Sequence, residues 1–249
     1  MAFSTVEAIV LREVHYKEAD RILTLYSRQE GKITAKARGA LRKSSRTGAA
    51  TQQLTFSEMT LFGNMGKYTV NEATVIEPFS GLRENFENYA LGCYFAECIE
   101  MLTEENNPEE EILQLILNSL YALSRSLYDP ALVKAVFEMR LMSLLGYMPD
   151  LDACCICGRE APEEPCLGLE TGRICCRGCR NKDVGPTDFL CTSSLQAIKY
   201  AIASPAKKIF SCRIGGEELE RMSGACEDYL LFQADRHFPT LDYWKKIKR

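Results

Sequence analysis

The first eighty residues alternate between apolar and polar positions in short runs, as strands with one buried face do. Turn-forming residues separate the runs at 29–31, 39–52 and 63–66. Five strands in about eighty residues indicate a small barrel, and the OB-fold is the commonest five-stranded choice. An SH3-like barrel is the structural alternative. The predicted strands are residues 5–14, 21–26, 32–38, 54–62 and 67–76.

From Ser80 the apolar residues recur every three or four positions, which is the period of a helix with one buried face. Pro108 suits the first turn of a helix, Asp129 can cap the next one, and Gly146 can end it. The predicted helices are 83–102, 108–127, 130–145, 193–203 and 217–235. The fold class is therefore α+β and multidomain. We expect a barrel over residues 1–80 and a helical domain over 81–249, interrupted by an insertion at 150–185.

The insertion contains two C-x2-C pairs separated by eighteen residues. This spacing lies within the zinc-ribbon pattern, in which two tight turns present four thiolates to one ion. We predict that one structural Zn²⁺ is bound by the four cysteines of these pairs. A shell closed by four thiolates has no position for water or substrate, so catalysis by the metal is not expected. The predicted ligands are Cys154, Cys157, Cys176 and Cys179.

Neighbouring cysteines leave the choice of ligands open. Using Cys155 would give a C-x-C pair and using Cys175 a C-x3-C pair, whereas Cys166 lies between the two pairs. A redox role for one C-x-x-C pair is a further alternative. Another five of the twelve cysteines stand among apolar residues, where we expect small core side chains. These five are Cys93, Cys98, Cys191, Cys212 and Cys226.

Composition and charge narrow the class of protein. Hydrophobic residues make up 46% of the chain and charged residues 26%, as in ordinary globular proteins. Charges interrupt the apolar N-terminal residues too early for a signal peptide, so a reducing cytoplasm is expected. Residues 1–80 carry 11 basic and 8 acidic side chains, whereas residues 81–153 carry 4 and 13. A surface that binds polyanions is therefore expected outside the middle of the chain.

Six basic residues and no acidic residue lie between positions 32 and 46. Lys32, Lys36 and Arg38 share one parity in the predicted strand, and the others follow in a glycine-rich loop. Such a cluster neutralises phosphates without sequence preference, although a solvated loop is the plain alternative. On an OB-fold it would lie beside the groove that binds single strands with stacking aromatics. The candidate residues are Lys32, Lys36, Arg38, Arg42, Lys43 and Arg46, with aromatic candidates Tyr16, Tyr26, Phe56, Phe62 and Tyr68.

A second basic group closes the chain, and it follows Tyr243 and Trp244. We interpret it either as a nucleic-acid contact or as a frayed tail. Enzymatic motifs are not found: the two histidines have no local partner pattern, and phosphate-binding loops and H-E-x-x-H are missing. We therefore expect no catalysis. The terminal basic residues are Lys245, Lys246, Lys248 and Arg249.

The order of these parts resembles the RecO family of bacterial recombination mediators over essentially the whole chain. Residues 7–12 and 18–26 look like that family's first two strands, and 36–40 like its basic turn. Residues 144–151 resemble its approach to the ribbon. The resemblance implies DNA contact at the basic residues 32–46 and zinc at the two cysteine pairs. The doubled cysteines Cys155 and Cys175 depart from the family pattern.

The same resemblance implies a non-enzymatic role in DNA repair. Family members bind single- and double-stranded DNA, anneal complementary strands, and act with RecR and sometimes RecF. They help to load RecA onto strands covered by single-strand-binding protein, whose acidic C-terminal tail they contact through the helical region. A cytoplasmic protein that associates with the nucleoid during repair is implied. The alternative is a zinc-ribbon adaptor in transcription or translation that binds proteins through its acidic helices.

Overall fold

The computed structural model describes residues 2–64, 67–160, 162–180 and 184–248. The chain forms two compact units. One combines Met1–Arg125 with Phe238–Arg249 and is called the barrel unit below. The other, Ser126–His237, is called the ribbon unit. This division follows packing, and the domain limits at 80, 150 and 185 remain a prediction from the sequence.

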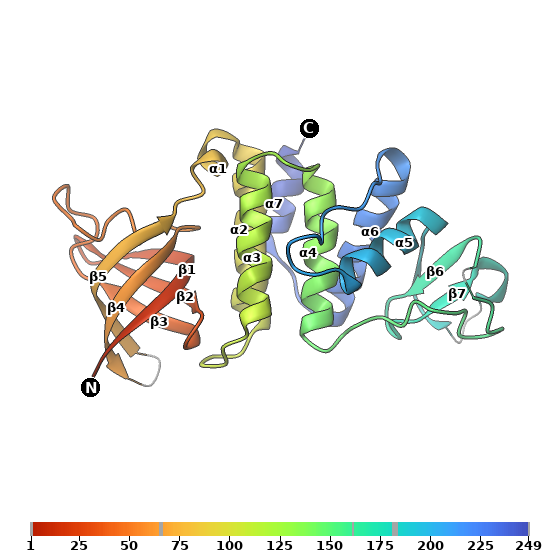
Figure 1. The fold of residues 1–249 in the computed structure, drawn as a ribbon, viewed down its shortest axis with the longest axis horizontal. Helices are drawn as coiled ribbons and strands as arrows, with labels where there is room; N and C mark the ends of the chain where they lie inside the picture. Colours follow the sequence, from red (N-terminus) through yellow and green to blue (C-terminus); the bar gives the residue numbers. More distant parts are fainter. Residues whose placement is uncertain (1, 65–66, 161, 181–183, 249) are drawn as a thin grey trace. The chain divides into compact units, whose positions relative to one another are not determined.

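Five strands close into a barrel in the order β1-β2-β3-β5-β4 (Figure 1). Only β3 and β5 pair in parallel, and every other neighbouring pair of strands is antiparallel. Alternate side chains such as Val6, Leu23 and Ile33 fill the interior, which explains the period-two pattern of the sequence. This is the OB-fold, as predicted. The strands are β1 Ala2–Tyr16, β2 Asp20–Ser27, β3 Gly31–Ala37, β4 Phe56–Asn64 and β5 Lys67–Glu77.

Helices α1 (Ser80–Glu84), α2 (Phe86–Leu102) and α3 (Glu110–Ser124) follow the barrel. The single helix predicted at 83–102 is divided at Asn85, whose side chain accepts a hydrogen bond from Asn88 N at 3.1 Å. This is an N-cap, and it restarts the helix in a new direction. The helix predicted at 108–127 corresponds to α3, which ends at Ser124. Leu127 lies beyond this end, is exposed, and does not extend the buried stripe.

The interpretation of the C-terminus as a frayed tail is wrong. Residues Pro239–Ile247 form helix α7, which packs against α2. Trp244 is only 2% exposed. At the start of α7, Glu97 of α2 accepts hydrogen bonds from the backbone and hydroxyl of Thr240. A carboxylate at a helix N-terminus satisfies N–H groups that have no partner within the helix.

The ribbon unit consists of three long helices and a small sheet. Asp129 caps α4 by accepting a hydrogen bond from Ala131 N at 2.8 Å, and Gly146 follows the helix with φ +91°. Both features agree with the sequence. The sheet has the order β7-β6-β8. Its elements are α4 Pro130–Leu144, β6 Pro165–Gly168, β7 Ile174–Cys176, the short 3-10 helix η1 Arg177–Cys179, β8 Thr187–Phe189, α5 Thr192–Ala203 and α6 Gly216–Ala234.

A charged cluster is buried between α4 and α6. The Lys134 ammonium lies 2.9 Å from Glu138 Oε1 and 2.8 Å from Glu227 Oε2. Side-chain exposure is 1% for Lys134 and 0% for Glu138. Burial lowers the pKa of Lys134, but the two carboxylates outweigh it and the pKa is raised above its ordinary value.

Among the described helices, none combines the length and apolarity that a membrane crossing requires.

Candidate metal centre and nucleic-acid interface

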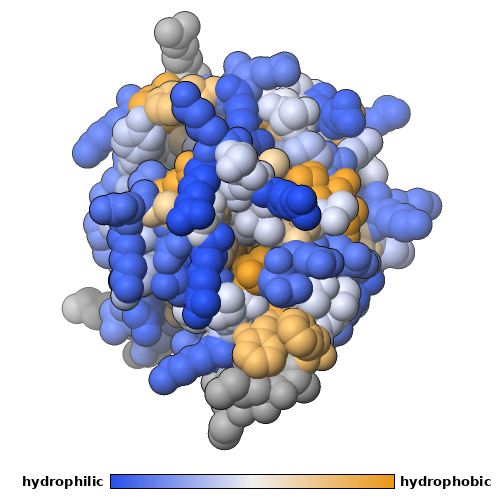
Figure 2. Space-filling view, turned by 90° about the vertical axis from the view of Figure 1, so that its left-hand side faces the viewer, coloured by the Kyte–Doolittle hydropathy of each residue, from blue (hydrophilic) through white to orange (hydrophobic). Residues whose placement is uncertain are grey.

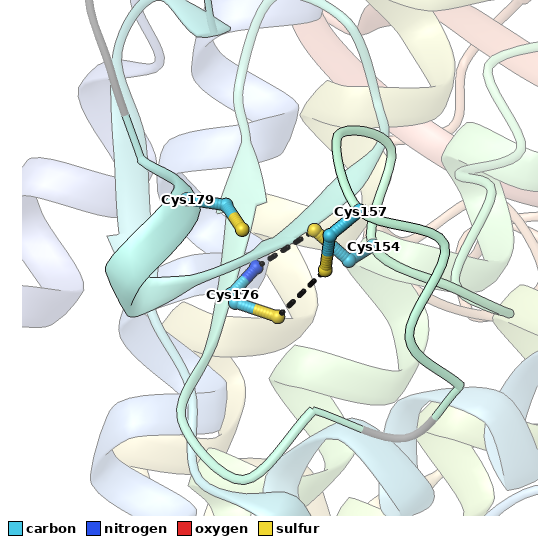
Figure 3. A group of neighbouring side chains, drawn as sticks. All are labelled: Cys154, Cys157, Cys176 and Cys179. Atoms are coloured by element: carbon cyan, nitrogen blue, oxygen red, sulfur yellow. Dashed lines mark hydrogen bonds between the residues drawn. The ribbon is translucent and has the colours of Figure 1, made fainter.

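The two C-x2-C pairs converge at one end of the small sheet (Figure 3). All four sulfur atoms lie within 4.8 Å of one another. The first pair lies in a tight turn closed by a 2.9 Å hydrogen bond from Gly158 N to Cys154 O. The second pair comes from the end of β7 and from η1. The four cysteines of the preferred spacing, Cys154, Cys157, Cys176 and Cys179, are thus brought together in space.

The geometry of the sulfur atoms fits a tetrahedral metal. Zn–S bonds of about 2.3 Å place sulfur atoms about 3.8 Å apart in a tetrahedron. The Sγ atoms of Cys157 and Cys176 are 3.7 Å apart, and Cys176 N donates to Cys154 Sγ at 3.2 Å. A backbone N–H aimed at sulfur stabilises a thiolate, which is the form that binds metal.

The pKa values of the clustered thiols also suit a cation. Burial raises the pKa of Cys154, but N–H groups of Cys157, Cys176 and Ile156 lower it to about 6 overall. Burial and the neighbouring thiols raise the pKa of Cys176 to about 12. Four thiols so close together therefore resist losing all their protons by themselves. A dication supplies the positive charge that lets them do so.

The three additional cysteines of this region lie outside the sulfur cluster. Cys166 and Cys175 face each other across β6 and β7, and both are fully buried. Burial raises the pKa of Cys175 to about 12, so this thiol stays protonated at neutral pH. These residues and the half-buried Cys155 pack in one cluster with Cys154, Cys176 and Cys179. They behave as small apolar side chains of the ribbon core.

A pair of carboxyl groups lies where β8 meets α6. Burial, followed by the charge of Asp228, raises the pKa of Asp188 to about 6. Because this pKa is raised above the usual 3.8 for aspartate, the folded state binds the proton more tightly than the unfolded chain does. The contribution of Asp188 to the stability of the ribbon unit therefore falls as the pH rises from about 4 through 6.

We expect Asp188→Asn to remove this pH dependence. The variant should unfold with a free energy about 1–2 kcal/mol larger than wild type at pH 7.5, after allowance for partial solvent exposure. At pH 4, where Asp188 is protonated, the two proteins should be nearly equal. Urea unfolding followed by circular dichroism at both pH values measures the difference. If the free energy of unfolding of the variant exceeded that of wild type by the same amount at pH 4, the assignment to charge repulsion would be contradicted.

The structure separates Lys32 from the other basic candidates. The Lys32 ammonium donates to Glu100 O at 2.7 Å and also to Thr103 O. These carbonyls lie at the C-terminal end of α2, where carbonyl groups lack partners within the helix. A cation there also complements the helix dipole. Lys32 therefore joins the barrel wall to α2.

Lys36 lies farther along the same strand and remains partly exposed. Its ammonium is 2.9 Å from Asp20 Oδ2 and 4.9 Å from the centre of the Tyr16 ring. The hydrogen bond from Lys36, followed by one from Gly39 N, lowers the pKa of Asp20. Tyr16 is 43% exposed, so the cation and the ring share an accessible surface.

The remaining four candidates lie in the segment that follows β3. All are exposed, and within the described ranges none has a carboxylate within 4.0 Å. The segment is held in place by the buried Arg21, which donates to Gly48 O at 2.8 Å and to Thr51 Oγ1 at 3.0 Å. The Arg21 Nε lies 3.1 Å from Glu13 Oε2. We call this segment the basic loop; its cations are Arg38, Arg42, Lys43 and Arg46.

The aromatic candidates divide into core and surface. Tyr26 and Phe56 are buried, and the Tyr26 hydroxyl accepts a hydrogen bond from Glu109 N at 3.2 Å. The half-buried Tyr68 donates to Glu30 at 3.2 Å. Tyr16 and Phe62 are exposed. Of the five candidates, Tyr16 and Phe62 are therefore the two whose rings are accessible to solvent.

Two of the C-terminal basic residues, Lys245 and Lys246, belong to α7, and Lys248 follows the helix directly. Lys248 lies over the Trp244 ring at 5.1 Å, and the burial of Trp244 leaves that ring unable to stack on a base. Lys245 and Lys246 are in the last turn of the helix, where cations complement its dipole. Arg249 lies outside the described residues.

Comparison with known proteins agrees with the architecture. The family model for the N-terminal part of recombination protein O matches residues 1–79, and that for its C-terminal part matches residues 83–242. The chain belongs to the RecO family. The RecO resemblance proposed from the sequence is thereby confirmed. Together the two RecO segments span the OB-fold barrel, the helices and the four clustered cysteines.

Individual RecO proteins match over most or all of their length. "DNA repair protein RecO" of Acetivibrio thermocellus is 32% identical, with 100% of this chain and 99% of the relative aligned. The Symbiobacterium thermophilum protein of the same name is 30% identical over the same shares. That of Listeria monocytogenes is 36% identical over 71% of this chain and 69% of the relative. The chain is therefore a DNA repair protein of the RecO family.

Sequence reasoning missed two residues of this candidate interface. Arg21 was assigned only to a strand, yet it anchors the basic loop. Phe3 lies before the predicted first strand, whereas the structure includes it in β1 opposite Phe62. Its side chain is 63% exposed. An arginine at an otherwise apolar barrel position and an aromatic residue continuing the alternation of β1 were the available signals.

Proposed function

We propose that the protein is a non-enzymatic recombination mediator that binds single- and double-stranded DNA through its barrel. The observation that carries the proposal is the basic loop. Its four exposed cations lack carboxylate partners among the described residues, and Arg21 fixes the backbone that presents them. Lys36 and Tyr16 extend the same surface along the barrel. Cations held in this way displace counterions from phosphates and gain affinity for any sequence.

In this proposal the protein anneals complementary strands without ATP. Two DNA strands repel each other, and a cationic surface lowers that repulsion while each strand remains free to shift its register. Weak contacts made mainly to phosphates suit such sliding better than base-specific clamps. The same contacts would hold a strand while it is transferred to RecA, with RecR and, where present, RecF as partners.

We further propose that Cys154, Cys157, Cys176 and Cys179 hold one Zn²⁺. The ion would link the turn at residues 154–158 to η1 and reinforce its link to β7, which already includes the hydrogen bond from Cys155 N to Ile174 O at 2.8 Å. Four thiolates complete a tetrahedral shell, so its contribution is to folding. The predicted limits of the inserted ribbon, 150–185, enclose these four ligands.

The helical region is proposed to bind the acidic C-terminal tail of single-strand-binding protein. A pocket of about 590 Å³ beside α5 supports this assignment. Its lining includes Lys199 and Arg213, which suit a carboxylate-rich tail, together with Tyr200 and Ala203. A tail that combines acidic groups with a terminal apolar side chain would use both kinds of contact.

Replacing Arg38 and Arg42 by alanine should weaken DNA binding and flatten its dependence on salt. Each phosphate contact contributes about 0.7 to the slope of log K against log salt for single strands and about 0.9 for duplex. The slope should therefore fall by about 1.4–1.8, while the melting temperature changes little. Fluorescence anisotropy at four or more salt concentrations measures this slope. The matched control is Lys207→Ala with Lys208→Ala, which removes two exposed cations from the ribbon unit. An unchanged slope would remove the basic loop from the DNA interface.

The mediator proposal is tested by annealing. Two complementary oligonucleotides are each coated with the cognate single-strand-binding protein and mixed with the full chain in the absence of nucleotide. Faster duplex formation than in the protein-free mixture is expected. DNA binding without acceleration, even when RecR is added, would contradict the mediator role. A complete lack of DNA binding would favour the zinc-ribbon adaptor instead.

A further inference from the structure

Two exposed aromatic residues form a pair on the outer wall of the barrel. Phe3 of β1 and Phe62 of β4 are directly opposite each other in the strand register. Their ring centres are 5.0 Å apart with an angle of 47° between the planes. Phe3 is 63% exposed and Phe62 39% exposed. Figure 2 shows the barrel end of the molecule, where hydrophilic side chains cover most of the surface and small pale-orange patches stand among them.

Nothing in the described part of the chain explains why both rings are exposed. A cross-strand aromatic pair adds to sheet stability, but threonine would fill the same positions without exposing apolar surface. The next outward pair along β1 and β4 is in fact Thr5 opposite Thr60. Acidic residues begin beside the threonine pair, where Thr60 is also paired with Glu72 of β5, and Glu7 faces Glu58 one step farther. At the aromatic pair itself, the neighbour of Phe62 on β5 is the uncharged Thr69.

The strand register connects this pair to the cationic surface. Phe62 is paired with Thr69 of β5, and Thr69 is paired with Lys36 of β3. Lys36 is therefore two strand spacings, or about 10 Å, from Phe62 on the same wall. Lys36 in turn lies over the exposed Tyr16 ring. A continuous path runs from the aromatic pair across a threonine to the cation and ring at the edge of the proposed DNA interface.

We propose that Phe3 and Phe62 form a stacking platform for the unpaired bases of single-stranded nucleic acid. The inference rests on the proposed function and specifies which nucleic acid the barrel prefers. Every base has a π-face, so stacking on exposed rings adds affinity without sequence preference. In a duplex the bases already stack on each other and their faces are inaccessible. The platform therefore favours single strands, whereas the basic loop binds both forms through phosphates.

The chemistry of the surroundings favours a nucleic acid over a protein at this position. Protein interfaces require a well-packed apolar centre within about 800 Å² per partner. Here the two rings are bordered by Thr5, Thr60 and Thr69, and Lys36 lies one strand beyond Thr69. A ring for stacking and a cation one strand farther suit the bases and phosphates of a single strand. Binding of an apolar protein segment is instead an outcome that the experiment distinguishes.

The test compares three double variants of the full chain. Phe3→Ala with Phe62→Ala removes both rings. Phe3→Leu with Phe62→Leu keeps apolar volume without a π-face, and Phe3→Tyr with Phe62→Tyr keeps the rings. Anisotropy with a labelled oligothymidylate and with a hairpin duplex gives both affinities over a salt series. Phe232→Ala, at a 42% exposed site on α6, is the matched control for loss of an exposed ring. Melting curves verify that each variant is folded.

Single-strand affinity of the alanine variant should fall about 5- to 150-fold, with an unchanged salt slope and unchanged duplex affinity. The leucine variant should be nearly as weak, and the tyrosine variant should bind like wild type. Wild-type single-strand affinity in the folded alanine variant would overturn the platform and leave the mediator proposal intact. Full affinity in the leucine variant would also overturn it, since apolar contact rather than stacking would then suffice. Failure of the wild-type chain to bind any DNA would instead defeat the proposed function itself.

Discussion

Replacing Cys157 by serine should release zinc from the purified protein and unfold the small sheet of the ribbon unit. The sheet has only three short strands, and its few apolar side chains are insufficient to stabilise it alone. Binding of structural zinc contributes about 10–16 kcal/mol in isolated zinc-finger peptides, and this binding free energy is folding free energy. Serine has no thiolate, so the remaining three ligands hold the ion far more weakly.

Metal analysis by mass spectrometry and thermal melting measure these two effects. We expect about one zinc per wild-type chain and a large loss of zinc in the variant, together with a lower melting temperature of the ribbon unit. Cys155→Ser is the matched control, because Cys155 adjoins Cys154 but lies outside the sulfur cluster. It should keep the metal. DNA binding should persist in the Cys157 variant, since the basic loop belongs to the barrel unit.

Normal zinc content and melting of the Cys157 variant would show that the ligand set is wrong. Zinc loss in the Cys155 variant, with retention in the Cys157 variant, would point to the alternative C-x-C register. Treatment of the wild-type protein with a chelator offers an independent comparison. It should lower the melting temperature to that of the Cys157 variant, and added zinc should restore only the wild-type protein.

Local patterns predicted most of the secondary structure because each element carries its own period or its own end signals. The barrel strands follow from alternation, and α4 follows from Asp129, Pro130 and Gly146. Helix α7 was missed because its terminal lysines dominate the composition. Its buried face is only Leu241 and Trp244, three residues apart, and its burial depends on α2, which is distant in the sequence.

The candidate interface shows where local reasoning stops. Parity correctly places Lys32 and Lys36 on the outer side of one strand, but it cannot tell that the end of α2 covers Lys32. Tyr26 and Phe62 are likewise both outward in the strand alternation. The segment around Glu109 covers Tyr26, whereas Phe62 remains exposed. Which outward residues are accessible is decided by contacts distant in the sequence.

The cysteines illustrate the opposite case, in which spacing carries the geometry. Two C-x2-C turns of matching form present four sulfur atoms within 4.8 Å of one another, as their spacing predicts. Spacing alone could not exclude Cys166 or Cys175 as metal ligands. The pairing of β6 with β7 excludes them, because both side chains point into the buried core of the ribbon.

Replacement of Lys134 by methionine should lower the stability of the ribbon unit by about 3–5 kcal/mol. Methionine matches the lysine stem in volume, so packing between α4 and α6 is retained. The loss comes from Glu138, which is 0% exposed, and from Glu227, because both carboxylates would remain buried without their cation. Cys226 beside them has a pKa raised chiefly by burial, which shows how little this region favours negative charge. Urea unfolding monitored in the ribbon unit measures the change.

Two further measurements identify charge as the cause. Lowering the pH from 7 to 5 should narrow the difference between variant and wild type, since protonation neutralises the unpaired carboxylates of the variant. Adding Glu138→Leu and Glu227→Met to Lys134→Met should recover most of the lost stability, because removing a buried ion cluster completely leaves no unpaired charge.

In the wild type, the pKa of Lys134 is raised, so its contribution to stability is full below the ordinary value of 10.5 and declines only at more alkaline pH. A Lys134→Met variant that is as stable as wild type at pH 7 would contradict this account. An apolar triple variant less stable than the single variant would do so as well, since the buried polar contacts would then outweigh the cost of their burial.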